Sequence, residues 1–389
     1  MRILVSSVAG WGHVHPMVPL ARAFLDRGDE VLWATASSLC GRVEEAGIRT
    51  APAGIEISEA LKLMYERFPE IAALPPEERP GFAFSRLFGA VLASGMLQDL
   101  LPAARDWRPA LTISDAGELA APLVAASLGI PNVNHGFGAV LPAERVQRAG
   151  EFVDPLWEQM GLEPRPYAGC YDHLYLDIYP PGLSSGDLSY IPHVQPLRPV
   201  PFAGVSQEPL PFELDPALPL LYVTMGTVFT QDISVLKAAV EGAGSLQAEV
   251  VVTVGPAGDP DDLGGQPGNV HVARYIPQTA LLGRCAAVIS HAGSGTFLAA
   301  LSHGLPQLCL PQAADQFLNA QACADAGVGL TLMPGAVTAG SVREATLRLL
   351  NEAQFREAAE RGAAEMDRMP GPDEVAEIIA RRFARSVPS

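Results

Sequence analysis

The chain of 389 residues, 48% hydrophobic and 18% charged, is long enough for two domains and apolar enough to fill a core in each. Its formal net charge of -17 argues against a nucleic-acid partner, and its five scattered cysteines, without a C-x-x-C pair, argue against a disulfide framework or a zinc site. The N-terminus is built like a strand rather than a signal peptide, and no uninterrupted apolar stretch has the length of a membrane span, so we expect a cytoplasmic protein that binds no membrane.

Strand-like and helix-like stretches alternate along the first part of the chain. The expected strands are residues 2–7, 30–35, 110–114 and 131–135, and the expected helices are residues 16–27, 39–46 and a stretch that ends at Leu128. This alternation predicts a parallel, doubly wound sheet, which binds ligands at the carboxyl ends of its strands.

Two stretches of the first half depart from this pattern. Residues 55–88 mix prolines with aromatic residues, and such a segment either caps the core or lines an apolar pocket. Residues 142–201 are rich in proline, and residues 194–199 are expected to lead into a linker between two domains.

The second half repeats the alternation. Strands are expected at residues 220–224, 249–254, 270–273 and 286–290, and helices from about residue 234 and at residues 296–303. A last helix over about residues 372–385 carries Val375, Ile378, Ile379 and Phe383 on one face. Two similar halves joined by a linker predict a cleft between two domains.

Residues 291–319 combine a glycine turn, a helix start and a polar end. After the strand at 286–290, the small residues of His291-Ala-Gly293-Ser294-Gly295-Thr296 expose backbone N–H groups at the positive end of a helix, where a phosphate would fit. Further on, Asp315 and Gln316 place a carboxylate beside an amide, a combination suited to the hydroxyls of a sugar. The glycine turn alone is more often an ordinary strand-turn-helix unit.

Two residues of the N-terminal half have side chains suited to acid–base chemistry. His13 follows the first strand, and its imidazole could remove a proton from a hydroxyl or could cap the next helix. Asp115 ends another strand and could orient that imidazole, or could form a helix-capping box with Glu118. Asp115 can fill both roles.

Residues 291–319, together with Pro277 and Gln278, resemble the C-terminal signature of the GT-B fold glycosyltransferases of family 1. The likeness is in particular to the bacterial branch that decorates polyketides and other natural products. The matching residues are Pro277, Gln278, His291 to Thr296, Gly304 to Pro306, Pro311, Asp315, Gln316 and Asn319. The likeness covers nearly the whole chain. It implies an α/β fold with two Rossmann-like domains and parallel sheets that face each other across a cleft.

The resemblance also implies a separate function for each domain. Residues 1–205 would bind the acceptor, residues 206–219 would be the linker, and residues 220–371 would bind a nucleotide-sugar. The helix within residues 372–389 would pack back on the first domain, and residues 55–88 would hold the acceptor.

The same resemblance assigns roles to single residues. His13 lies in a turn like the family's Gly-His-x-x-Pro turn and would be the catalytic base, Asp115 would orient it, and His15 has no counterpart. Tyr275 stands where relatives often have a tryptophan that stacks on the nucleotide base. The residues expected to hold the donor are Gly12, Thr224, Gly226, Thr227, Tyr275, Ile276, Gln278, His291, Gly293, Ser294, Gly295, Thr296, Asp315 and Gln316.

One departure from the family bears on the donor. Some relatives place a glutamate on the phosphate-binding helix that binds both ribose hydroxyls, and the matching residue here is Ala299. We therefore expect a dTDP-sugar, whose ribose lacks the 2′-OH, or else a UDP-sugar. The expected reaction is inverting transfer of a sugar, expected to be a deoxyhexose, to a hydroxyl of a hydrophobic aglycone.

Neither a metal nor a cofactor is expected. Asp259 and Asp261 have the D-x-D spacing of a metal site but lie in a loop rich in glycine and proline, where a solvated turn is expected. Gly10-x-Gly12 lacks the third glycine of a nicotinamide site. Two alternatives stay open, a nucleotide-sugar epimerase of GT-B architecture and a non-catalytic auxiliary partner of a glycosyltransferase. A homodimer is compatible with the sequence.

Overall fold

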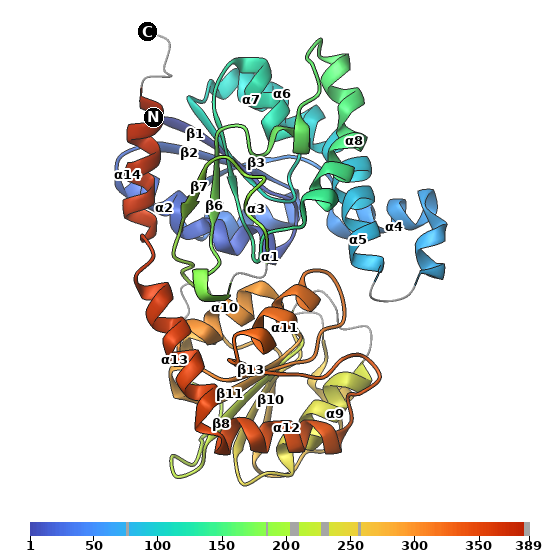
Figure 1. Ribbon diagram of the computed structural model, residues 1–389, viewed down its shortest axis with the longest axis vertical. Helices are drawn as coiled ribbons and strands as arrows, with labels where there is room; N and C mark the ends of the chain where they lie inside the picture. Colours follow the sequence, from blue (N-terminus) through green and yellow to red (C-terminus); the bar gives the residue numbers. More distant parts are fainter. Residues whose placement is uncertain (75–77, 184–185, 203–209, 227–232, 256–257, 385–389) are drawn as a thin grey trace. The chain divides into compact units, whose positions relative to one another are not determined.

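The computed structural model (Figure 1) describes residues 1–389 except 75–77, 184–185, 203–209, 227–232, 256–257 and 385–389. The chain forms two compact units. Unit 1 comprises Met1–Tyr179, Gly186–Phe202 and Pro370–Ser389, and unit 2 comprises Pro180–Ser185 and Ala203–Met369. Each unit is built on one parallel sheet with helices, so the predicted α/β class is confirmed.

Unit 1 contains a seven-stranded sheet in the order β3-β2-β1-β4-β5-β6-β7, with every pair parallel. Its central strands β1 and β4 are buried except at Arg2, as expected for a sheet covered on both faces. The order reverses between β1 and β4, and ligands of such sheets bind at the carboxyl ends of the strands at this switch point. The strands are β1 (Arg2–Ser6), β2 (Glu30–Thr35), β3 (Arg49–Pro52), β4 (Leu111–Asp115), β5 (Asn132–His135), β6 (Leu174–Asp177) and β7 (Val194–Pro196).

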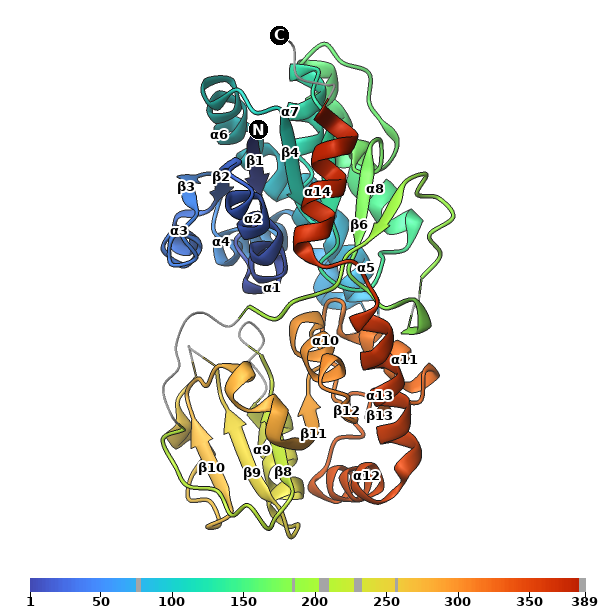
Figure 2. The ribbon, with the colours of Figure 1, turned by 90° about the vertical axis from the view of Figure 1, so that its left-hand side faces the viewer.

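The helix expected over residues 16–27 is two pieces, a 3-10 turn (His15–Met17) and α2 (Val18–Asp26), and the short helix α1 (Trp11–Val14) precedes them. The other helices of unit 1 that flank its strands are α3 (Ser37–Glu44), α7 (Ala121–Leu128), α8 (Ala143–Gln159) and α14 (Pro372–Phe383). Helix α14 packs against α2, as Figures 1 and 2 show, and its buried residues include Val375, Ile379 and Phe383. A late segment of the chain thus completes the unit that begins at residue 1.

The stretch from residue 55 to residue 107 is mostly helical. It forms α4 (Ile57–Arg67), a 3-10 turn (Pro69–Ala73), α5 (Arg79–Phe84), a π-helix (Ser85–Leu92) and α6 (Ala93–Trp107). The last three are one continuous helix, Arg79–Trp107, which among the described residues is long and apolar enough to cross a membrane. Arg86 and Asp99 interrupt its apolar residues, so this helix does not contradict the expectation that no uninterrupted apolar stretch has the length of a membrane span. Core helices of soluble proteins share this composition, and 44% of the apolar window is buried inside the protein.

Unit 2 contains a six-stranded sheet in the order β10-β9-β8-β11-β12-β13, again parallel throughout (Figure 2). Here the order reverses between β8 and β11. The strands are β8 (Leu220–Thr224), β9 (Glu249–Thr253), β10 (Val270–Ala273), β11 (Cys285–Ser290), β12 (Gln307–Cys309) and β13 (Gly329–Thr331). The helices are α9 (Ile233–Gly244), α10 (Ser294–Ser302), α11 (Gln316–Asp325), α12 (Ala339–Asn351) and α13 (Ala353–Asp367).

Two features of the proline-rich stretch were not predicted. The 17-residue helix α8 runs through Pro155 and buries Val146, Ala149, Val153 and Trp157. These residues are three or four positions apart, which is the helical period. In addition, Val194–Pro196 is the edge strand β7 rather than the start of a linker. Proline is tolerated at a sheet edge because it need not donate to a neighbour there.

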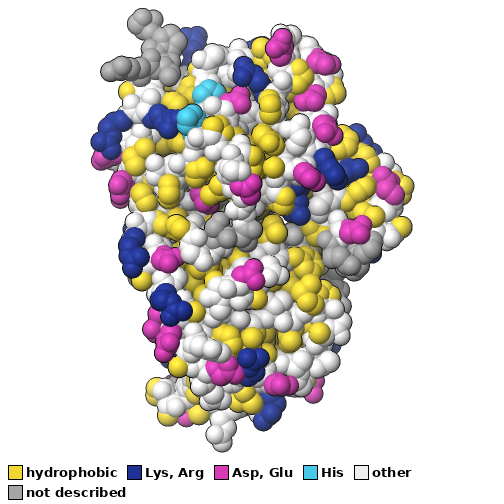
Figure 3. Space-filling model, in the orientation of Figure 1, with side chains coloured by type: hydrophobic (Ala, Val, Ile, Leu, Met, Phe, Trp, Pro, Cys, Tyr) yellow, Lys and Arg dark blue, Asp and Glu magenta, His cyan; other side chains and the backbone are white. Residues whose placement is uncertain are grey.

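Figure 3 shows how charged side chains are distributed on one face of the molecule. On the face shown in Figure 3, acidic and basic side chains are interspersed, and no stripe of Lys and Arg is visible there. That face offers no electrostatic footprint for a nucleic acid.

Candidate active site

The first polar cluster lies at the switch point of the unit 1 sheet. β1 leads into α1, which carries His13, while β4 ends at Asp115 itself. Because the register pairs Ser6 of β1 with Ser114 of β4, the two loops start side by side. His13 Nδ1 lies 2.8 Å from Asp115 Oδ1, so the structure brings these two predicted residues together.

The Asp115 carboxylate is buried and fixed by the backbone. The Gly117 N–H donates to Oδ1 at 2.6 Å, and the Val8 N–H donates to Oδ2 at 2.9 Å. A carboxylate only accepts hydrogen bonds, so Nδ1 of His13 carries a proton and Nε2 of the neutral ring has a free lone pair. The His13 side chain is 18% exposed, so a solute can reach it. A base held by a buried carboxylate is an arrangement for proton abstraction.

The capping box weighed for Asp115 and Glu118 is absent from the described structure. Helix α7 begins at Ala121, and Asp115 makes no bond to its first turn. Instead, the Glu118 carboxylate accepts the N–H groups of Ala120 at 2.7 Å and Ala121 at 3.1 Å, as well as the Ser6 hydroxyl at 2.6 Å. Asp115 is thus left to bind His13.

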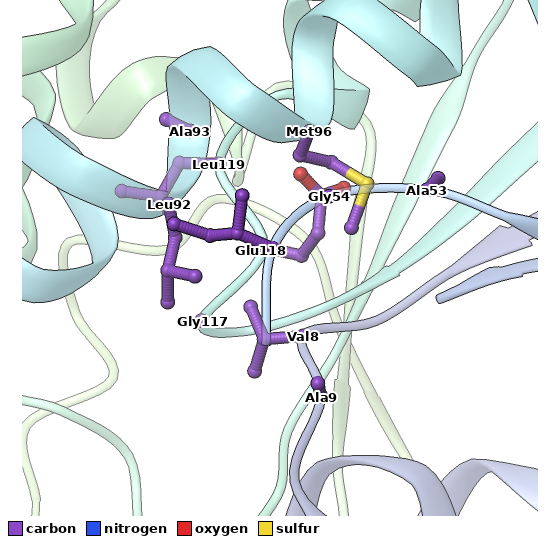
Figure 4. A pocket seen from close by; sticks show the side chains of 11 residues that line it. Val8, Ala9, Ala53, Gly54, Leu92, Ala93, Met96, Gly117, Glu118 and Leu119 are labelled. Atoms are coloured by element: carbon purple, nitrogen blue, oxygen red, sulfur yellow. The ribbon is translucent and has the colours of Figure 1, made fainter. Parts of the chain in front are cut away.

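Glu118 is an uncommon group for a protein interior. It is 1% exposed, and burial raises the pKa of its carboxyl to about 7, while its hydrogen bonds oppose the rise. Figure 4 shows it among apolar side chains, pointing toward Met96 and Gly54. It lies three residues from Asp115, whose charge also raises its pKa.

Aromatic rings surround the His13 imidazole. The ring centroid of Phe88 lies 5.6 Å away and that of Phe137 lies 4.7 Å away. On its own turn, a Cβ at Gly10 would lie 2.8 Å from His13 Cδ2, so this close approach requires glycine. Gly12 is exposed and has open space around it.

The second cluster lies at the switch point of the unit 2 sheet. β11 ends at Ser290, next to Thr224 of β8, and the chain then passes through Ala292 in the left-handed region, at φ 62°, to Gly293. No side chain caps α10, which begins at Ser294. Its first N–H groups therefore offer the donors and the positive dipole end that bind an anion.

Two glycines make room for the His291 ring. A Cβ at Gly226 would lie 2.6 Å from ring atoms, and a Cβ at Gly293 would also overlap the ring. Burial lowers the pKa of His291 to about 4, against the opposing influence of the Asp315 carboxylate and a hydrogen bond to the Thr224 carbonyl. The imidazole is therefore neutral near pH 7. Thr227 lies outside the described residues.

A hydrogen-bond network ties Asp315 to the start of α10. Asp315 Oδ2 accepts the Ser294 hydroxyl at 2.6 Å and the Asn319 amide at 3.2 Å. The Asn319 amide also donates to the Ala292 carbonyl at 2.8 Å. Gln316 is buried, and its side-chain oxygen accepts the backbone N–H groups of residues 312 and 313. The predicted sugar-binding carboxylate is thus fixed beside the predicted phosphate-binding turn.

The segment after β10 is joined to the same helix start. Gln278 Nε2 donates to Thr296 Oγ1 at 2.8 Å. Tyr275 is 45% exposed, as a ring that stacks on a base must be, whereas the Ile276 side chain is buried in the core. Gly295 is exposed at the start of α10.

The D-x-D pair lies in a local turn. The Asp259 carboxylate accepts the Asp261 N–H at 3.1 Å, which is a local turn. No group of three His, Cys, Asp or Glu side chains suited to a metal ion occurs among the described residues.

Sequence reasoning gave no individual role to Phe88, Phe137 or Asn319, although Phe88 lies in the stretch expected to hold the acceptor and Asn319 is among the residues that carry the resemblance. Asn319 follows Asp315 by four residues at a helix start, and this spacing is the signal that could have revealed their hydrogen bond. The two phenylalanines carry no such signal, since many aromatic residues of this chain only fill the core.

Comparison with known proteins gives a consistent result. Residues 22–209 match the model for "Erythromycin biosynthesis protein CIII-like, N-terminal domain", and residues 237–381 match the corresponding C-terminal domain. The chain is 34% identical to the elloramycin glycosyltransferase ElmGT of Streptomyces olivaceus, covering 98% of each chain. It is 31% identical to the L-demethylnoviosyl transferase of Streptomyces niveus, covering 100% of both.

Solved structures agree. The glycosyltransferase SnogD from Streptomyces nogalater matches with a TM-score of 0.79 at 31% identity, covering 98% of this chain and 99% of that one. The glycosyltransferase VinC in complex with dTDP matches with a TM-score of 0.83 at 26% identity, covering 99% and 100%.

Proposed function

The chain belongs to the erythromycin biosynthesis protein CIII-like family of antibiotic glycosyltransferases, and we propose a specific reaction for it. It transfers the sugar of a dTDP-sugar to a hydroxyl of a hydrophobic aglycone, with inversion at the anomeric carbon. The observation that carries this proposal is the hydrogen bond between His13 and the buried Asp115. Relatives over the full length are named as transferases, which favours transfer over the epimerase and auxiliary alternatives.

In the proposed reaction, unit 1 binds the acceptor and unit 2 binds the donor. His13 Nε2 takes the proton of the acceptor hydroxyl while the oxygen forms a bond to the anomeric carbon. The bond from that carbon to the diphosphate breaks, and dTDP leaves with the electron pair. Asp115 stabilises the imidazolium that forms. One displacement at one carbon inverts its configuration.

The leaving diphosphate gains negative charge as the bond breaks. The uncapped N-terminus of α10, beginning at Ser294, supplies backbone donors and a positive dipole end for this charge. We propose that this stabilisation replaces a metal ion and that no cofactor takes part. Turnover should be unchanged when EDTA is added to the assay, and a requirement for added Mg²⁺ or Mn²⁺ would contradict this part of the proposal.

The proposed donor is a dTDP-sugar. Ala299 is buried in the core of unit 2, so it offers the ribose 2′-OH no polar partner. The VinC structure was solved with dTDP, which supports the same choice here. In calorimetry dTDP should bind more tightly than UDP. Clearly tighter binding of UDP would contradict the proposal of a dTDP-sugar donor.

The decisive experiment separates chemistry from donor binding. His13→Ala should lower kcat for transfer to an alcohol acceptor by about 10²- to 10⁴-fold, the usual contribution of a general base. The variant should still bind dTDP in calorimetry, because His13 belongs to the acceptor unit. His193→Ala, which removes an exposed imidazole from the same unit, is the matched control and should keep full activity. Near-normal turnover in His13→Ala would remove the base assignment.

A further inference from the structure

An eight-residue π-helix interrupts the long helix Arg79–Trp107 beside the His13–Asp115 pair. The helix is α-helical up to Phe84, π-helical over Ser85–Leu92 and α-helical again from Ala93. π-helical turns are rare and shift the facing of every side chain that follows, which is why they often mark functional sites.

The π-helix is held in place by close contact with α8. A Cβ built at Gly89 would overlap the backbone carbonyl of Ala149, so the two helices touch through backbone atoms at this point. This contact fixes the rotation of the π-helix and with it the direction of the neighbouring Phe88 side chain.

Phe88 lies beside the His13 ring and beside the Gly117 turn that binds Asp115. Its ring centroid lies 5.6 Å from that of His13, with the planes inclined by 49°. It also covers the turn after β4, since a Cβ at Gly117 would lie 2.9 Å from Phe88 Cε1 and 3.1 Å from Asp115 Oδ1. Gly117 is the residue whose N–H binds that same carboxylate oxygen.

We infer that Phe88, directed by the π-helix, is a positioning residue that holds the His13 imidazole on Asp115 and shields their hydrogen bond from water. Water competes for a carboxylate oxygen, and an apolar ring over the Gly117 turn denies it that approach. The ring also limits rotation of the imidazole, so Nε2 keeps one direction. A general base misplaced by about 1 Å can lose about 10²-fold in rate.

This inference rests on the proposed function, because positioning matters only if His13 is the base. A different role for Phe88, as a wall that contacts only the acceptor, predicts a different result. Loss of such a wall would raise the acceptor KM and leave the hydrogen bond between His13 and Asp115 intact.

The test uses the full-length protein with ¹⁵N-labelled histidine. The His13 Nδ1–H proton should give a slowly exchanging NMR signal, identified by its loss in His13→Ala. In Phe88→Leu the signal should broaden through exchange with water, and kcat should fall about 10- to 100-fold with little change in acceptor KM. Trp107→Leu removes an aromatic ring from the far end of the same continuous helix, outside the stretch expected to hold the acceptor, and should preserve both readouts. A thermal melt verifies that each variant is folded.

The outcomes are distinct. A sharp Nδ1–H signal in Phe88→Leu, or a change confined to the acceptor KM, would overturn the positioning role and leave the proposed function standing. Absence of the signal from the wild-type protein would overturn the pair itself and both proposals with it.

Discussion

The buried carboxyl of Glu118 predicts a defined pH dependence of stability. Its pKa rises from an ordinary value of 4.5 to about 7, chiefly through burial. Between these two values the folded state holds the proton and the unfolded chain has released it. Raising the pH therefore favours unfolding. At about 1.4 kcal/mol per pH unit, the carboxyl lowers the free energy of unfolding by about 3 kcal/mol as the pH rises from below 4.5 to above 7.

Glu118→Gln removes this pH-dependent contribution to the free energy of unfolding, because an amide keeps the shape of the side chain but does not ionise. The substitution also weakens a bond to Ser6 or to the start of α7, at a cost of about 1 kcal/mol that does not depend on pH. The informative quantity is therefore the difference in unfolding free energy between the variant and the wild type. It should shift in favour of the variant by about 3 kcal/mol between pH 4.5 and pH 8.5.

Urea unfolding followed by tryptophan fluorescence measures this difference in the right part of the molecule. All four tryptophans, Trp11, Trp33, Trp107 and Trp157, lie in unit 1 together with Glu118. The signal therefore reports the unfolding of that unit. If the difference between variant and wild type is the same at pH 4.5 and pH 8.5, the carboxyl titrates normally, and the reasoning from burial is refuted.

Two further predictions use matched glycines. Gly293→Ala places a Cβ against the His291 ring and should weaken dTDP binding at least about 10-fold in calorimetry. The control is Gly268→Ala, where a Cβ meets nothing within 4 Å, and it should bind dTDP like the wild type. Equal affinities of the two variants would show that the His291 ring can move aside. In Gly89→Ala the added Cβ overlaps a backbone carbonyl of α8, and the variant should lose about 1–3 kcal/mol of stability in thermal unfolding. The control is Gly95→Ala, later in the same helix, where the added Cβ makes only an ordinary contact. It should be neutral or stabilising by up to about 1 kcal/mol. A Gly89→Ala protein as stable as the wild type would mean that the π-helix is not fixed by α8.

The elements that could be predicted from the sequence are those whose pattern is local. Buried parallel strands are continuous apolar runs, and glycines such as Gly28 and Gly129 end the helices between them, so the alternation can be read directly. The turn from β11 into α10 was predictable for the same reason. The contact between His13 and Asp115 follows once β1 and β4 are neighbours, because Asp115 is the last residue of β4 and His13 lies in the short helix α1 that follows β1.

The features that were missed depend on tertiary packing. Helix α8 contains Pro155 and lies in a proline-rich stretch, yet its buried face, which includes Val153 and Trp157, packs well enough to outweigh the lost hydrogen bond. The place of Phe88 beside His13 depends on a π-helix that no local pattern announces. Glu118 was read as part of a capping box with Asp115, because spacing alone does not show where α7 begins.

The packing of α14 against α2 has a consequence for synthesis on the ribosome. The residues that complete the N-terminal unit, among them Val375, Ile379 and Phe383, are translated after nearly all the rest. Unit 2 is almost contiguous in sequence and can fold while α14 is still unmade. The nascent N-terminal segment must therefore wait with the apolar residues of α2 that α14 covers exposed, and chaperones recognise such apolar surfaces. Truncation before residue 372 would leave these residues uncovered permanently.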